Sequence, residues 1–248
     1  MFKVNDRDRV RDYVLELAAS DQRIVAGAVV GSLALNEGDR WSDLDLTFAV
    51  SDGIPVGEVL EDWTRNIVRD FDAVPLFDLP SGAFIYRVFL IPDCLQFDLS
   101  FAPTSEFSAT GPKFRLLFGS SVSRPHPALP SSEMLLGYAV HHALRARFSI
   151  ERERYWEAEY WISGVRDYAL SLACLRRDLP SYYGKGFDRL PPNVRAVFSG
   201  ALVKSLTRDE LLRALGCAID GLLSEKGAVQ DLAGKTEPQL RKLTTAWE

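Results

Sequence analysis

The first hundred residues alternate between two spacings of apolar side chains. Val10, Val14 and Leu17 recur at helical intervals, and the short β-branched runs that follow are typical of strands. We therefore predict interleaved helices and strands in this part of the chain. The expected elements are a helix over residues 6–19, strands over 24–30 and 44–50, a helix over 56–71, and strands over 74–78, 84–91 and 94–102.

The pattern changes to long helical segments after Pro130. Ser131 and Ser149 are candidate N-caps, which predicts helices ending near Arg147 and Arg177. Two later helices are expected at capping-box sequences, one at Thr207 with Glu210 and one at Thr236 with Gln239. The stretch over residues 103–130 is rich in Ser, Gly and Pro, which indicates a connecting segment.

These patterns predict an α+β protein in which a small mixed β-sheet domain with flanking helices is followed by an all-helical bundle. The expected divisions are a sheet domain over residues 1–105, a linker or substrate-side loop over 106–130, and a helical domain over 131–248.

Composition narrows the class of protein. The 248 residues are 47% hydrophobic, enough for an ordinary buried core, and no apolar run approaches the roughly 20 residues of a membrane span. The charged start argues against a signal peptide, so a cytoplasmic location is expected. A net charge of −5 argues against nucleic acid as a partner. Residues 1–110 carry −10 and residues 111–248 carry +5, which suits an acidic metal-binding part and a basic part that receives an anion; two unrelated solvated surfaces are the alternative.

Two predicted strands carry aspartates among alternating apolar residues. Asp43 and Asp45 share one face of the strand at 44–50, opposite Leu44 and Leu46. Asp98 occupies the polar face of a later strand, so the three carboxylates meet if the two strands are neighbours. Three crowded negative charges require neutralisation, and carboxylate oxygens are the ligands that hard divalent cations prefer. The alternative is a half-exposed strand with surface aspartates.

Gly31 and Ser32 directly follow the strand at 24–30. A glycine permits close approach of a phosphate to the backbone, and the serine hydroxyl and amide can donate to phosphate oxygens. A phosphate-binding turn beside a carboxylate cluster indicates attack on a nucleotide phosphate.

Gly-Ser, ten intervening residues, Asp-x-Asp on a strand and a third carboxylate on a later strand resemble the signature of polymerase-beta-like nucleotidyltransferases. The helical second half resembles the branch that contains aminoglycoside and lincosamide nucleotidyltransferases. The resemblance implies a catalytic domain over residues 1–105 and two Mg²⁺ ions on Asp43, Asp45 and Asp98, with Asp98 as general base or its positioner. It also implies nucleotide binding by Gly31, Ser32 and Ser42.

By the same resemblance, Lys185 in the turn over residues 181–191 would reach the triphosphate, with an exposed turn lysine as the alternative. Four residues of one helix form a candidate wall for the acceptor, although they could equally belong to the core stripe of the bundle. They are Glu157, Glu159, Trp161 and Arg166.

The implied reaction moves a nucleoside monophosphate from a nucleoside triphosphate, ATP by expectation, to a hydroxyl of a small-molecule acceptor and releases pyrophosphate. Expected acceptors are antibiotics of the aminoglycoside or lincosamide kind. Two alternatives are modification of a partner protein, as in toxin–antitoxin pairs, and a nucleotide-binding module without catalysis.

Overall fold

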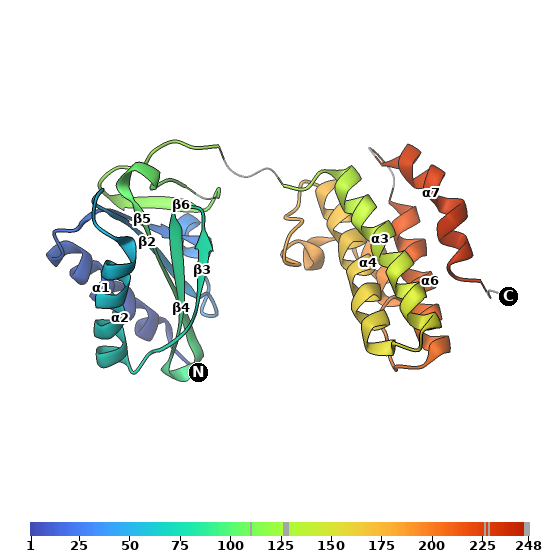
Figure 1. The fold of residues 1–248 in the computed structure, drawn as a ribbon, viewed down its shortest axis with the longest axis horizontal. Helices are drawn as coiled ribbons and strands as arrows, with labels where there is room; N and C mark the ends of the chain where they lie inside the picture. Colours follow the sequence, from blue (N-terminus) through green and yellow to red (C-terminus); the bar gives the residue numbers. More distant parts are fainter. Residues whose placement is uncertain (110, 126–128, 226, 228, 246–248) are drawn as a thin grey trace. The chain divides into compact units, whose positions relative to one another are not determined.

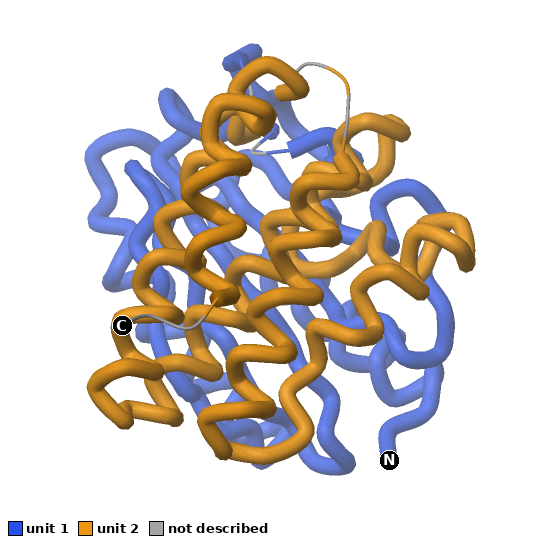
Figure 2. Tube along the Cα trace, turned by 90° about the vertical axis from the view of Figure 1, so that its right-hand side faces the viewer, with its two compact units in different colours: residues 1–128 blue, residues 129–248 orange. Residues whose placement is uncertain are grey.

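A computed structural model describes residues 1–245 apart from residues 110, 126–128, 226 and 228. The chain divides into two compact units, residues 1–128 and residues 129–248, drawn in different colours in Figure 2. The predicted fold class is confirmed, because a mixed sheet with flanking helices precedes a helical region (Figure 1). Among the described residues, no helix is long and apolar enough to cross a membrane.

The first unit is built on one six-stranded sheet. Its strands follow the order β3-β4-β5-β2-β1-β6, in which β2 and β5 run parallel and every other pair is antiparallel. The elements are α1 (Val4–Ser20), β1 (Ile24–Val30), β2 (Leu44–Val50), α2 (Val56–Phe71), β3 (Val74–Ser81), β4 (Phe84–Ile91), β5 (Leu95–Pro103) and β6 (Phe114–Phe118), with 3₁₀ turns η1 (Gly31–Leu35), η2 (Pro92–Cys94) and η3 (Thr104–Glu106).

The two faces of this sheet are covered unequally. On one face, α1 and α2 bury a large apolar core that includes Trp63, Phe48 and Phe97. The other face carries a much smaller cluster, built around alanines of β1, β2 and β5 together with Phe84 and Phe107. The second face therefore has room for polar side chains, while the helices packed on the first face hold the strands in place.

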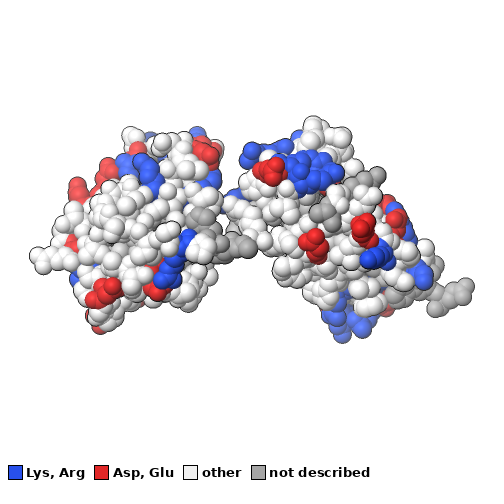
Figure 3. All heavy atoms as spheres, turned by 90° about the horizontal axis from the view of Figure 1, so that it is seen from above, with Lys and Arg blue, Asp and Glu red and all other residues white. Residues whose placement is uncertain are grey.

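The segment over residues 106–130 contains β6, which pairs with β1 and closes one edge of the sheet. Three basic residues of this segment, Lys113, Arg115 and Arg124, thus belong to the first unit, which then carries −7 against +2 for residues 129–248. The difference in net charge between the two compact units is therefore smaller than the difference between residues 1–110 and residues 111–248. Both signs of charge are interspersed on the faces drawn in Figure 3.

The second unit packs α3 (Ser132–Glu151), α4 (Tyr155–Leu175), α5 (Pro192–Ser199), α6 (Arg208–Ser224) and α7 (Gln230–Lys242) around one apolar core, with 3₁₀ turn η4 (Phe187–Arg189) after α4. Ser149 lies inside α3, and α4 begins only after Glu153, whose φ of 57° ends the preceding turn. Thr236 also lies inside its helix, where its hydroxyl donates to carbonyl oxygens one turn earlier. The caps predicted at Ser149 and Thr236 are therefore wrong.

A half-buried ion-pair network joins the segment between α1 and β1 to α2 of the first unit. Asp21 accepts hydrogen bonds from Arg23 and, at 2.9 Å, from the indole nitrogen of Trp63. Hydrogen bonds from Arg23, and secondarily from Trp63, lower the pKa of Asp21 from 3.8 to about 2 against the opposing effect of its burial. Because the folded-state pKa is depressed, the stabilisation is present above pH 3.8 and is lost as the pH falls toward 2.

Asp21→Ala is therefore expected to lower the free energy of unfolding by about 2 kcal/mol at pH 7, with the difference from the parent shrinking below about pH 4. Urea unfolding across that pH range measures both effects. Asp62→Ala is the matched control, because Asp62 pairs with the same arginine from a more exposed position and should cost less. Equal losses for the two variants would contradict the assigned role of Asp21.

Candidate metal and nucleotide site

Three carboxylates meet on the thinly covered face of the sheet. Asp45 in β2 lies directly beside Asp98 in β5 in the parallel register, and Asp43 stands just before β2 begins. Each of the three is half-buried and offers one carboxylate oxygen such that these oxygens all lie within 4.8 Å of one another. This separation is short enough for one or two divalent cations to be shared between them.

The three aspartates predicted from strand alternation are thus brought together. Deeper along the same face, Ser100 donates to Thr47 at 2.8 Å, and both side chains are buried. That pair occupies the next position on the same face of β2 and β5.

The carboxyl group of Asp98 has a raised pKa. Burial raises the pKa of its carboxyl group above the ordinary value, the hydrogen bond donated by Gln96 at 3.0 Å opposes this, and the charge of Asp43 raises the pKa again. A carboxylate with raised proton affinity on a reacting face can accept a proton from a substrate hydroxyl.

The Gly31 turn is fitted to Asp45. Gly31 has a φ of +70°, and a Cβ at this position would lie 2.3 Å from Oδ2 of Asp45. Any side chain here would collide with the carboxylate, so the glycine is required both for the turn and for the position of Asp45. The Gly31 amide donates to the carbonyl of Lys113 at 3.2 Å, so this donor is occupied within the unit.

Ser32 and Ser42 differ in how their hydroxyl groups are used. The Oγ atom of Ser32 is buried and has no hydrogen-bond partner among the described residues. Ser42 instead stabilises the turn before Asp43, since its Oγ accepts from the Asp39 amide at 2.9 Å and donates to the Asp39 carboxylate at 3.1 Å. Ser32 therefore has a hydroxyl without a partner among the described residues, next to Gly31 in the chain, whereas the hydroxyl of Ser42 is already bonded.

Arg7 holds the loop that leads into the carboxylate site. Its side chain extends from α1, is only 6% exposed, and donates to the carbonyl oxygens of Asp39 and Ser42 at 2.7 and 2.8 Å. Arg7 was not among the predicted site residues, although it lies at helical spacing on the same stripe as Val10 and Val14. A charge on a buried stripe is the signal that indicates such an anchor.

Arg7→Met is expected to lower the free energy of unfolding by about 2 to 4 kcal/mol, because two part-buried carbonyl groups lose a charged donor. Urea unfolding measures the loss. Arg9→Met is the control, since Arg9 is an exposed residue of the same helix whose guanidinium lies over Phe71. The role of Arg7 as an anchor would be refuted by equal stabilities of the two variants.

The predicted acceptor residues of α4 are largely engaged within their own unit. Trp161 packs edge-on against His142 with ring centroids 4.7 Å apart. Glu157 accepts a hydrogen bond from Trp161 at 3.4 Å and lies 3.6 Å from both Arg145 and Arg154. Both Trp161 and Glu157 remain half-buried, so they combine packing with partial exposure.

Two more of the predicted residues also pair locally. Glu159 accepts from Ser163 at 2.7 Å, and Arg166 forms an ion pair with Asp167 at 2.8 Å. Lys185, in contrast, is exposed in the turn before η4, where its ammonium group lies 5.5 Å from the ring centroid of Tyr182. These residues belong to the second unit, and the three aspartates belong to the first.

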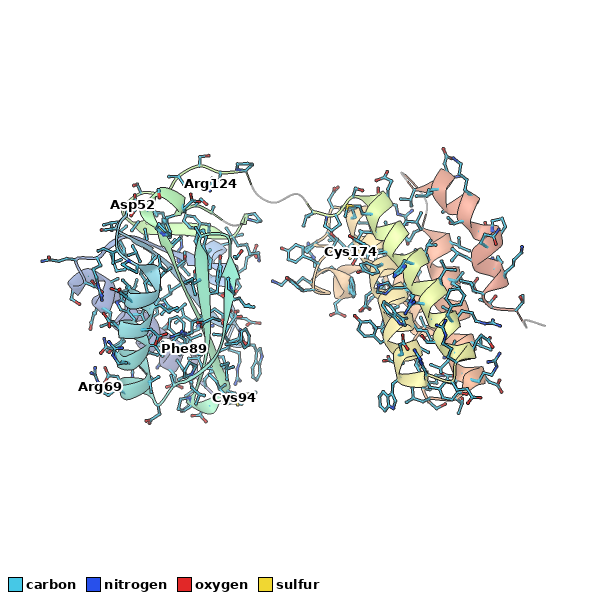
Figure 4. The ribbon with its side chains drawn as sticks, in the orientation of Figure 1. Asp52, Arg69, Phe89, Cys94, Arg124 and Cys174 are labelled. Atoms are coloured by element: carbon cyan, nitrogen blue, oxygen red, sulfur yellow. The ribbon has the colours of Figure 1, made fainter. Side chains whose placement is uncertain are left out.

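The cysteines take no part in the carboxylate site. Cys174 is buried in α4, whereas Cys94 in η2 is exposed and Cys217 is half-buried (Figure 4). Of the three thiols, only that of Cys174 is buried.

No family model matches the sequence, and no curated protein matches it. Among solved structures, the chain is similar to an aminoglycoside 6-adenyltransferase from Bacillus subtilis, with 14% identity, a TM-score of 0.35, and coverage of 95% of this chain and 97% of that one. It is also similar to JHP933 from Helicobacter pylori, with 12% identity, a TM-score of 0.28 and 97% of each chain covered. At such scores the whole-chain superposition is weak.

Proposed function

We propose that this protein is a magnesium-dependent nucleotidyltransferase that moves a nucleoside monophosphate from ATP to a hydroxyl group of a small-molecule acceptor and releases pyrophosphate. The observation that carries the proposal is the set of Asp43, Asp45 and Asp98, whose carboxylate oxygens lie within 4.8 Å of one another beside the Gly31 turn. All donors are hard oxygens on rigid strands, which fits Mg²⁺ and a substrate with phosphate oxygens.

Asp43 and Asp45 would hold two Mg²⁺ ions, and Asp98 would complete the site. Bound magnesium supplies charge neutralisation for the triphosphate and for the leaving pyrophosphate. Asp98 accepts the proton of the attacking hydroxyl or positions that hydroxyl, a role supported by its place beside Asp45 on the thinly covered face of the sheet. The hydroxyl oxygen forms a bond to the α-phosphorus as the bond between that phosphorus and the pyrophosphate oxygen breaks.

Gly31 and Ser32 would lie beside the β- and γ-phosphates. Ser32 has the stronger support, because its buried hydroxyl has no partner among the described residues and can donate to a phosphate oxygen. Ser42 would act indirectly, by fixing the turn that presents Asp43.

The second unit would supply Lys185 for the triphosphate and part of α4 for the acceptor. Glu157, Glu159, Trp161 and Arg166 remain the proposed acceptor-side residues of this unit. Their local pairs with other side chains would have to loosen or be shared for direct contact. Antibiotics of the aminoglycoside or lincosamide kind are the first class of acceptor to test.

Mass spectrometry tests the proposal directly. The full chain is incubated with ATP, Mg²⁺ and a panel of hydroxyl-bearing small molecules, and release of pyrophosphate is measured alongside. Formation of an acceptor–AMP adduct together with pyrophosphate supports nucleotidyl transfer. If ATP neither binds nor reacts in the presence of Mg²⁺, the proposal is wrong.

Lys185→Ala is expected to weaken ATP binding about 5- to 150-fold, because a lysine contact with phosphate in a partly shielded cleft contributes about 1 to 3 kcal/mol. The effect should shrink at high salt. Calorimetric titration with Mg–ATP measures it, and Lys235→Ala, at an exposed lysine of α7, is the control. Equal affinities for the two variants would assign Lys185 to the surface alone.

A further inference from the structure

The open face of the sheet continues from the carboxylates into an exposed apolar strip on β4 and β3. In β4, Val88 lies directly beside Asp98 in the antiparallel register. In β3, Phe77 lies beside Val88. Residues paired across neighbouring strands point to the same face, so Asp98, Val88 and Phe77 form one row. We define the apolar strip as the exposed residues Val74, Phe77, Leu79 and Leu90; Val88, which lies between Phe77 and Asp98, is itself buried, with 5% exposed.

The strip is unusually exposed for apolar side chains. The exposed fractions are 53% for Val74, 51% for Phe77 and 54% for Leu79, and Leu90 beside them is 40% exposed. Neighbouring strands lie about 4.8 Å apart, so the centre of the strip lies roughly 10 Å from Asp98. This is within the length of a small-molecule substrate. Contiguous exposed apolar surface beside a reacting group is typical of a binding surface.

The strip also lacks charge. Asp78, the acidic residue of β3, points to the opposite face, where it pairs with Arg87 at 2.7 Å. Arg87 in turn donates to Thr64 of α2 at 2.9 Å, which fixes that pair on the helix-covered side. A polycationic ligand would therefore meet no carboxylate on β3 or β4 of the open face.

The direction of attack places the acceptor on this side of the sheet. In an in-line displacement, the nucleophile and the leaving group lie on opposite sides of the phosphorus atom. Pyrophosphate is proposed to lie at Gly31 and Ser32, which follow β1, and the strand order puts β1 on one side of β2 with β5, β4 and β3 on the other. The attacking hydroxyl then enters from the side of Asp98 and β4.

We propose that the acceptor is a neutral hydroxyl-bearing molecule with an apolar ring or alkyl face, and that this face packs on the apolar strip while the hydroxyl reaches Asp98. This inference rests on the proposed nucleotidyl transfer. Within that reaction, it favours neutral acceptors over polycationic ones. A second copy paired edge to edge on β3 is disfavoured, because Pro75 and Pro80 remove backbone donors from that edge strand.

The probe for this test is 4-(hydroxymethyl)benzophenone, a neutral aromatic alcohol that bonds covalently to nearby C–H groups under near-ultraviolet light. The full chain is irradiated with the probe in the presence of Mg–ATP, and labelled peptides are mapped by mass spectrometry. We expect labelling concentrated on residues 74–90. The double variant Phe77→Ser, Leu79→Ser should reduce it about tenfold or more.

Val68→Ser is the matched control, since Val68 is a 38% exposed apolar residue of α2 and its loss should leave strip labelling unchanged. The inference is overturned if residues 74–90 label no more than α2 does, or if the double variant labels like the parent. It is also overturned if the double variant melts lower or changes oligomeric state, because the strip is then covered by the helical unit or a second copy.

Calorimetry with Mg–ATP distinguishes failure of the proposed acceptor surface from failure of the proposed nucleotidyl transfer. Unchanged Mg–ATP affinity in the double variant, together with lost labelling, supports the acceptor surface. Absence of Mg–ATP binding in the parent protein refutes the proposed transfer, whereas normal Mg–ATP binding without strip labelling refutes only the acceptor inference.

Discussion

Asp45→Asn is expected to reduce nucleotidyl transfer by at least about 1000-fold, which corresponds to a loss of roughly 4 kcal/mol of transition-state stabilisation. Asp45 lies at the centre of the site, since it pairs in register with Asp98 and its Oδ2 occupies the space that Gly31 leaves open. Asparagine keeps the shape of the side chain but loses the charge that a divalent cation requires. Transfer is measured as acceptor–AMP adduct or pyrophosphate release.

The fold of this variant should be retained. Asp45 lies on the thinly covered face of the sheet, and the large apolar core is on the other side, so the substitution leaves that packing unchanged. Removing one of three crowded negative charges should leave the melting temperature of the metal-free protein equal or higher.

Asp52→Asn is the matched control for this experiment. Asp52 (Figure 4) lies just beyond the end of β2, at the opposite end of that strand from Asp43, and accepts hydrogen bonds from Ser105 at 3.0 and 3.1 Å. This variant should retain transfer. Normal turnover by Asp45→Asn, with its fold intact, would refute the assignment of the site.

Strand and helix spacing predicted most of the first unit. The bounds of β1, β2, α2 and β4 match the predicted ranges, because each has its own apolar period and a clear polar boundary. β6 was missed, since this short edge strand sits among Gly, Pro and Ser and depends on pairing with β1 rather than on a period of its own. Local sequence does not encode a partner that is more than eighty residues away.

The second unit shows where local signals mislead. Ser149 has the chemistry of an N-cap, but burial in the bundle extends α3 past it to Glu151. Thr236 and Pro238 are typical of a helix start, yet α7 begins at Gln230. In both places tertiary packing overrides the propensity of a single residue.

The three carboxylates of the candidate site could be predicted from the sequence, whereas the contacts that position them could not. Alternation placed Asp45 and Asp98 on polar faces, and the parallel pairing of β2 with β5 brings them into register. Two features required the three-dimensional structure: the collision that excludes any side chain at Gly31, and the buried Arg7 that holds the loop before Asp43. Both depend on contacts between segments that lie far apart in the chain.

Removal of divalent cation is expected to weaken ATP binding by at least about 100-fold. Without Mg²⁺, the triphosphate must approach three carboxylates whose oxygens lie within 4.8 Å of one another, and like charges at such distances repel strongly in a half-buried site. With Mg²⁺, the same carboxylates and the phosphate oxygens share the cations.

The variant Asp45→Asn sharpens this comparison. It removes one negative charge, so its ATP affinity in the absence of cation should equal or exceed that of the parent. Its gain on adding Mg²⁺ should be much smaller, because one cation ligand is lost.

The central claim is that Asp43, Asp45 and Asp98 form a metal site that binds a nucleoside triphosphate. Its most direct test is isothermal titration of the full chain with ATP, once with Mg²⁺ and once with EDTA. If these three aspartates form the metal site, ATP binds in the presence of Mg²⁺ and binds at least about 100-fold more weakly in the presence of EDTA. Equal affinity in the two conditions, or no binding of ATP with Mg²⁺, would contradict it.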